Sequence, residues 1–383
     1  MCGDNVRVKK IFVFITVFFI IFAIPANAKD VTDEISSSIG NELKTFESSL
    51  PDNIKEMLPN DFFEGDISSF NYQNFNQQTF MDMVIDLLFA NLPDILSSFA
   101  SMLSVILVAS ILNIMKKSFD QESMQNAFTI CSSVCVSLTV FTKLSNILDD
   151  CVDYITTICN SMTAFAPIMS SMYIMSGNIS SAAVSNTGIM LFITVLENFI
   201  VRSIVPIIKI STCFAIIRST NPNIDIGGFS KILKNTFTSV TVFTMSIFSF
   251  VMSYQNVLAQ GNDSLSLRTA RFAAGSFIPI VGGAVSDALK TVSSSLSIVK
   301  NSCGIIGIII IACLTLPILI SLFLNKLSFD ICAGISKTLS CSDEATVIEE
   351  ASSCCSFLLA IVSITCILFI FSITIFIKSG AGI

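Results

Sequence analysis

Long apolar stretches with few charged residues recur along the chain from about residue 95 to its end. Each approaches the roughly 20 residues that a helix needs to cross a bilayer, whereas strands of a membrane barrel would be short and alternating. The pattern predicts spans at residues 95–115, 127–148, 154–176, 187–208, 237–258, 303–324 and 352–377, with a weaker segment at 272–289. We therefore expect an all-α, polytopic membrane protein with seven or eight membrane segments.

The first residues have the pattern of a cleavable signal peptide. Arg7, Lys9 and Lys10 precede the apolar residues 11–24, and small residues follow at Ala26 and Ala28. This predicts a signal peptide at residues 1–28, an extracytoplasmic and partly helical segment at 29–80, and a polytopic helical membrane domain at 81–383.

The segment after the signal contains apolar residues at helical spacing. Such a stripe is expected to pack on the protein's own membrane domain more often than on a partner. Its members are Ile35, Ile39, Leu43, Phe46 and Leu50.

The positions of basic residues constrain the topology, because cytoplasmic loops are enriched in lysine and arginine. Lys116 and Lys117 follow the first expected span, which should run inward. If residues 154–176 crossed fully as a separate span, Lys231 and Lys234 would lie outside. We therefore expect residues 154–176 to re-enter the membrane and turn back, so that these four lysines share the cytoplasmic side.

Two short sequences recur in the same order. Residues 139–142 match 241–244, and the Phe-x-Pro-Ile pattern around Pro167 matches the one around Pro279. The matches suggest an internal duplication, although a chain so rich in Ile, Phe, Ser and Thr can also produce them by chance. Proline-broken segments at matching positions of two repeats often mark a transport pathway.

Composition narrows the function. The residues are 52% hydrophobic and 13% charged, mean hydropathy is +0.78 and histidine is absent, which removes the commonest general base and metal ligand. No phosphate-binding G-x-x-x-x-G-K-[ST] loop and no basic block for nucleic acid is present. We expect no enzyme activity, cofactor or metal, and we interpret most of the 13 cysteines as small hydrophobic residues, with a redox role for adjacent Cys354 and Cys355 as the alternative.

One charged residue lies in the middle of an expected span. Glu197 is followed by Asn198, and by Arg202 five residues on, which an α-helix places about 140° away. A direct ion pair between Glu197 and Arg202 therefore needs another helix or water. Glu197 is either part of a structural pair that joins helices or an ion-coupling carboxylate.

One block carries a family resemblance. Arg268-Thr269-Ala270-Arg271-Phe272, followed by Phe277-Ile278-Pro279-Ile280-Val281-Gly282-Gly283-Ala284-Val285-Ser286-Asp287-Ala288-Leu289, resembles the most characteristic block of stage III sporulation protein AE from endospore-forming Firmicutes. The strong Ile, Phe, Asn and Ser content suits a clostridial source. We call residues 268–289 the signature block.

The resemblance implies a role in sporulation. It implies a multi-pass subunit of a channel or secretion-like complex in the mother-cell membrane around the forespore, needed for late forespore gene expression after engulfment. The implied partners are other stage III sporulation membrane proteins and, through them, a forespore membrane partner. The rival hypothesis is a secondary transporter that uses the duplicated broken helices, with Glu197 or Asp287 as the coupling group.

The candidate packing or pathway residues combine the signature block with the other broken or charged positions. They are Arg268, Arg271, Pro279, Gly282, Gly283, Asp287, Pro167 and Glu197.

The signal-peptide pattern predicts that the mature protein begins at Lys29, because signal peptidase accepts small residues at the positions of Ala26 and Ala28. N-terminal sequencing of the membrane-extracted protein checks this. A sequence that starts before Ala26 would show that the segment is retained as an anchor.

Overall fold

The computed structural model describes most of the chain. The described residues are 46–48, 50–51, 55, 77–116, 118–119, 121–220, 227–277 and 282–378, with the backbone alone at 77–80, 83, 122, 227, 267 and 270–299. The predicted signal peptide and most of the segment after it lie outside these residues.

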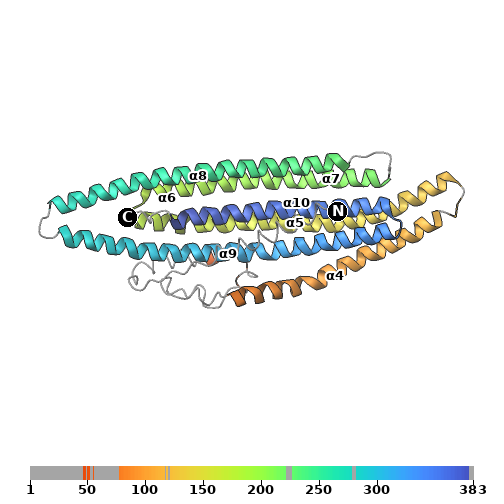
Figure 1. Cartoon of the computed structure of the whole chain (residues 1–383), viewed down its shortest axis with the longest axis horizontal. Helices are drawn as coiled ribbons and strands as arrows, with labels where there is room; N and C mark the ends of the chain where they lie inside the picture. The colour runs from red at the N-terminus through yellow and green to blue at the C-terminus, as the bar shows by residue number, and fades with distance from the viewer. Residues whose placement is uncertain are drawn as a thin grey trace.

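Every long element in this part of the chain is a helix. In chain order they are α4 (Gln77–Lys116), α5 (Glu122–Met175), α6 (Ile179–Val195), the π-helical η3 (Leu196–Val201), α7 (Arg202–Thr220), α8 (Gly227–Phe277), α9 (Gly282–Thr338) and α10 (Ser342–Lys378). The helices form an elongated bundle in which neighbours lie side by side along the same axis (Figure 1). The expected all-α fold class is confirmed.

The helices are much longer than a bilayer is thick. With 54 residues in α5 and 57 in α9, a rise of about 1.5 Å per residue gives lengths of roughly 80 Å and more, against about 30 Å of hydrocarbon. Within the described residues, six helices are long and apolar enough to cross a membrane. The expected count of seven or eight segments is therefore not shown, since the described residues provide six candidate spans.

Two expected spans merge into one helix. Residues 127–148 and 154–176 both belong to the helical run that ends at Met175, so residues 154–176 do not turn back. The acidic residues between them, Asp149, Asp150 and Asp153, are exposed on this helix. Exposed acidic residues do not interrupt a helix as glycine or proline would.

The weaker expected segment at 272–289 is not a separate helix either. It includes the last residues of α8 and the first of α9, and the residues between them, 278–281, lie outside the described part of the chain. Its moderate hydrophobicity belongs to the hairpin that these two long helices form (Figure 1).

Tight turns reverse the chain at two helix ends. After α5, Gly177 adopts φ 77°, and Asn178 N donates to Tyr173 O at 2.8 Å. After α9, Ser340 adopts φ 60°, and Cys341 N donates to Ser336 O at 2.9 Å. Both are Schellman motifs, in which a left-handed residue lets the chain satisfy the last helical carbonyls while it turns back.

The connections α4–α5, α7–α8 and α9–α10 lie at the same end of the bundle (Figure 1). Hydrogen bonds from Ser110 Oγ to Leu339 O, 3.4 Å, and from Ser133 Oγ to Ser219 O, 3.3 Å, join helices near this end. Lys116 at the end of α4 therefore shares an end with the start of α8, which carries Lys231 and Lys234. These lysines share one end because α5 and α6–η3–α7 each run the length of the bundle. No re-entrant segment is needed to bring them together.

The core forms around α10, which contacts α5, α7, α8 and α9. The apolar side chains on its inner face, from Val347 to Phe376, are among the most buried in the protein, whereas Ile367 and Phe371 are exposed. Phe46 and Leu50 also join this core, and the Phe46 ring lies 5.3 Å from that of Phe165 on α5. These two members of the predicted stripe thus pack on the protein's own helices, whereas its other members lie outside the described residues.

Close approach of α9 to α5 and α10 requires glycine. A Cβ atom at Gly307 would lie 2.9 Å from both Ile373 Cδ1 and Phe165 Cζ, and one at Gly304 would lie 2.2 Å from Ile377 Cγ1. Small residues at such positions let membrane helices pack at short distance.

Gly307→Leu is expected to lower the free energy of unfolding by about 1–3 kcal/mol, the usual cost of overpacking a filled core. Gly334→Leu, on the same helix but with open space around the added Cβ, is the matched control. Thermal unfolding of the detergent-purified variants measures both. Equal melting temperatures for the two variants would show that α9 does not depend on this contact.

Candidate functional site

A buried ion pair connects α8 to α10. Lys234 Nζ lies 2.6 Å from Glu350 Oε1, and the two side chains are 5% and 17% exposed. Ser230 Oγ donates to the same carboxylate oxygen at 2.5 Å, and Lys234 Nζ also donates to Ser353 Oγ at 2.7 Å. Because both charges have further hydrogen bonds, the pair compensates much of the cost of removing them from water.

A second buried carboxylate extends this cluster toward α4 and α5. Glu344 Oε1 accepts hydrogen bonds from Ser132 Oγ at 2.5 Å and from Asn113 Nδ2 at 3.2 Å. Asn113 Nδ2 also lies 3.4 Å from Cys341 Sγ. Burial raises the pKa of the Cys341 thiol, and this effect exceeds the lowering by its hydrogen bonds, so Cys341 stays a neutral thiol at pH 7.

Further contacts join α10 to α9. Ser352 Oγ donates to Asp330, which also pairs with Lys326 one helical turn away. Lys337 pairs with Glu349 at the exposed edge. We call the set Lys234, Glu350, Glu344, Asp330 and their hydrogen-bond partners the α10 polar cluster. It connects α10 to α4, α5, α8 and α9 near the end where α9 turns into α10.

A separate polar contact lies at the start of α6, at the end of the bundle opposite to the α10 polar cluster. Asp263 on α8 accepts hydrogen bonds from Ser180 N at 3.0 Å, Ser181 N at 2.9 Å and Ser181 Oγ at 2.7 Å. The free N–H groups of a helix start are satisfied by such a carboxylate, which also complements the helix dipole. Asp263 therefore caps α6 from a neighbouring helix.

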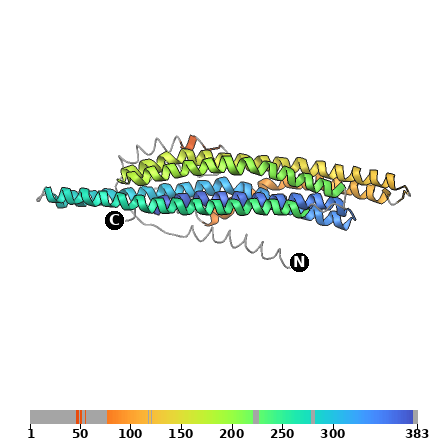
Figure 2. The ribbon, with the colours of Figure 1, turned by 90° about the horizontal axis from the view of Figure 1, so that it is seen from above.

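The signature block lies at the tip of the α8–α9 hairpin. This hairpin extends beyond the ends of α6 and α10 in both views (Figures 1 and 2). Arg268 is exposed near the end of α8, Arg271 follows on the same helix, and α9 starts at Gly282. Gly283 and Asp287 lie in the first turns of α9, and Pro279 lies outside the described residues.

The other two candidate residues lie apart from the hairpin. Pro167 is exposed within α5, which continues through it as a helix. Glu197 is exposed in η3. The structure thus distributes the predicted site residues over separate helices and does not gather them into one site.

The π turn changes the predicted geometry around Glu197. The 140° separation from Arg202 assumes 3.6 residues per turn, but a π-helix closes its hydrogen bonds from residue i to i+5. Arg202 therefore lies about one turn above Glu197 on the same outer side. Among the described contacts, neither side chain has an ion pair, so the internal pair that we considered for Glu197 does not form.

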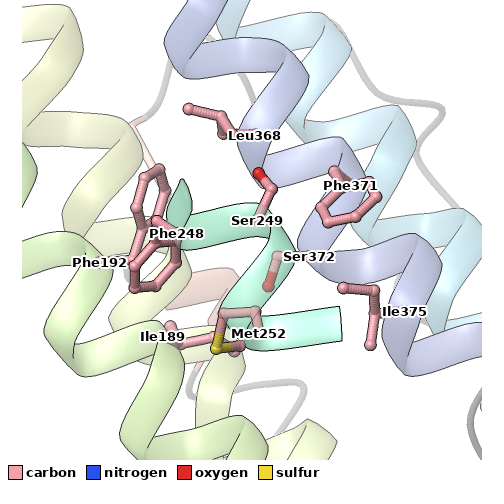
Figure 3. Close-up of a pocket in the computed structure, with 9 residues that line it drawn as sticks. All are labelled: Ile189, Phe192, Phe248, Ser249, Met252, Leu368, Phe371, Ser372 and Ile375. Carbon is pink, nitrogen blue, oxygen red and sulfur yellow. The ribbon is translucent and has the colours of Figure 1, made fainter. Parts of the chain in front are cut away.

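A small apolar pocket lies between α6, α8 and α10 (Figure 3). Phe192, Phe248 and Met252 line it, and Ser249 and Ser372 supply its only polar side chains. Its volume of about 10 Å³ has room for roughly one water molecule. This pocket is a packing gap and not a solute site.

Most of the described cysteines are buried as small core residues, whereas Cys131, Cys135 and Cys213 are exposed. Cys354 and Cys355 are free thiols and are fully buried, and Cys354 borders the Lys234 amine at 3.9 Å. Across the described residues, no group of His, Cys, Asp or Glu is placed to hold a metal ion.

Sequence reasoning missed the acidic half of the α10 polar cluster. Glu344 and Glu350 precede the uncharged part of α10, and acids at that place are typical of a solvated helix start. Lys234 was expected only as a marker of the cytoplasmic side. The available signal was the unusual density of Asp, Glu and Ser at residues 342–353, directly before an apolar span.

Together, six long apolar helices in the described part of the chain, with α10 at their centre and charges paired in the interior, define a polytopic α-helical membrane protein. A family model for stage III sporulation protein AE matches residues 60–380, and the chain belongs to this family. It is 24% identical over 355 residues to "Stage III sporulation protein AE" of Bacillus subtilis (strain 168), which covers 91% of this chain and 86% of that protein. No solved structure matches.

Removing one partner of the Lys234–Glu350 pair is expected to cost much stability, whereas replacing both partners by apolar residues is expected to cost little. Lys234→Met leaves Glu350 buried without its cation and should destabilise the protein by about 3–5 kcal/mol, whereas adding Glu350→Met should recover most of this loss. Lys337→Met, in the exposed pair with Glu349, should change stability by at most about 1 kcal/mol. Thermal unfolding in detergent measures all three. A double variant as unstable as Lys234→Met would contradict this account of the pair.

Proposed function

We propose that the protein is a non-enzymatic membrane subunit of a sporulation channel or secretion-like complex. The complex lies in the mother-cell membrane that surrounds the forespore, and it is needed for forespore development and late forespore gene expression after engulfment. The observation that carries the proposal is the family match, which spans residues 60–380 and so includes all six long helices.

A structural role for the charged groups supports a non-enzymatic function. Glu350, Glu344 and Asp263 are each held by hydrogen bonds to neighbouring helices. A general acid or base needs access to a substrate and a free lone pair or proton, whereas these carboxylates face other parts of the same protein. Their arrangement serves to hold the helices in register.

The position of the signature block supports a role in contacting partners. It lies at the end of the bundle opposite to Lys116 and the start of α8 (Figure 1). With those lysines on the cytoplasmic side, as positive-inside bias requires, the α8–α9 tip faces the space between the two membranes. This placement suits contact with other stage III sporulation membrane proteins and, through them, a forespore membrane partner.

The glycines of the signature block are expected to matter for this function. Replacing Gly282 or Gly283 by leucine adds bulk where the backbone begins a new helix after Pro279. Each variant should block formation of heat-resistant spores after engulfment while leaving membrane insertion intact. Counts of heat-resistant spores, alongside the membrane abundance of each variant, measure this effect.

Gly261→Leu is the matched control, because this α8 glycine has open space around an added Cβ. It should leave spore counts near wild type. Normal counts from both signature-block variants at normal abundance would remove the block from the mechanism. Asp287→Asn should be milder than the glycine variants, and a well-expressed Asp287→Asn without spores would favour the transporter hypothesis.

A further inference from the structure

The outer face of α6–η3–α7 carries three charged residues among exposed polar and apolar side chains, the apolar ones including Leu191 at 58% and Ile210 at 43% exposed. Exposed residues recur every three or four positions and so form one line along these helices. Glu197 is exposed beside this line. We call this surface the α7 polar face; its polar members are Thr187, Thr194, Glu197, Asn198, Arg202 and Lys209.

The neighbouring helix α8 shows a different outer surface at the same level. Phe192 on α6 stacks on Phe248 of α8 at 5.0 Å, so these parts of the two helices share one depth in the bundle. The outward side chains of α8 there are apolar; they include Phe243 at 66% exposed, Phe250 at 71% and Val257 at 63%. The α8 surface suits lipid, whereas the charged residues of the α7 polar face do not.

The polar face lies within a membrane-spanning stretch. A span of about 20 residues, placed anywhere in Ile179–Thr220, includes at least one of Glu197, Arg202 and Lys209. Charged residues in spans almost always face a protein interior or a water-filled cavity. Since these three are exposed in the described part of the chain, a further protein surface over this face would shield them from lipid.

Two of the charges on this face, Glu197 and Arg202, are opposite in sign. The π turn of η3 places Arg202 about one turn, roughly 5 Å, above Glu197 on the same side. Within the described part of the chain, neither side chain has a hydrogen bond or an ion pair. The face thus presents a separated acid and base, both without partners among the described residues.

We propose that the α7 polar face packs against the same face of a second copy of this chain, with Glu197 of each copy paired to Arg202 of the other. Copies inserted in one membrane share their orientation, so the two helices run parallel about an axis along the membrane normal. A twofold axis makes the contact self-complementary. Each arginine then reaches across one turn to the opposite carboxylate, as charged flanking residues do in parallel helix pairs.

The pairing explains two features of the sequence together. Polar Thr194 and Asn198 bond to their own helix through Met190 O and Thr194 O, so each has a partner for one donor within its own helix. The π turn explains why Glu197 and Arg202, five residues apart, lie on the same side of the helix. The proposal stands apart from the sporulation role, because it concerns how copies of the subunit meet.

Charge exchange in the full-length protein tests this pairing. Two differently tagged copies are co-expressed, extracted in mild detergent and captured through one tag. Wild-type copies should co-purify. Glu197→Arg or Arg202→Glu should reduce the captured second copy at least tenfold, because each variant opposes like charges across the axis.

The double variant Glu197→Arg with Arg202→Glu gives the decisive result. Double-variant copies should co-purify with each other at the wild-type level but not with wild-type copies, since mixed pairs oppose like charges at both contacts. Loss of capture from misfolding cannot produce this pattern. Phe250→Ala on the outer surface of α8 is the control and should leave capture unchanged.

Three outcomes would overturn the proposal. They are failure of wild-type copies to co-purify, single variants that pair at the wild-type level, and a double variant that pairs equally with wild type and with itself. Loss of capture with Phe250→Ala alone would instead place the contact between copies on α8.

Discussion

Close packing of α10 inside the bundle is the constraint on which the rest of the structure depends. This helix contacts α5, α7, α8 and α9, and Gly307 lets α9 approach within the reach of Ile373 and Phe165. Lipid offers no hydrophobic drive for helices to associate, so short-range packing and hydrogen bonds must hold them together. The arrangement of α5, α7, α8 and α9 follows from how each meets α10, while α4 packs on α5 and α9 and α6 packs on α5 and α8.

Hydrogen bonds complement this packing toward the ends of the bundle. Near the α9–α10 turn, Glu350 and Glu344 connect α10 to three other helices, and near the other end Asp263 on α8 caps α6. Each of these groups is buried, so each would be costly if its partner were absent. The contacts in the middle of the bundle are mainly apolar. The polar contacts near its two ends therefore set the relative positions of the helices along the axis.

The outer surface divides by chemistry. Phe243 and Phe250 on α8 are exposed apolar side chains that suit lipid, while Glu197 and Arg202 on the neighbouring helices are exposed charges. A monomer surrounded by lipid would expose apolar side chains on every side at a given depth. A subunit of an assembly can expose both kinds of surface at one depth, because one side faces lipid and another faces protein.

The sequence by itself determined the membrane class, the all-α fold and the family, since long uncharged runs and the signature block are local patterns. It did not determine where helices end: the acids near Asp150 suggested a loop, yet α5 continues through them because helix formation tolerates exposed charges. Nor did it reveal that Lys234 meets Glu350, because residues far apart in the chain become partners only when α8 packs on α10. The orientation of Glu197 was decided by the π turn, and its exposure by which face of α6 and α7 the rest of the bundle covers.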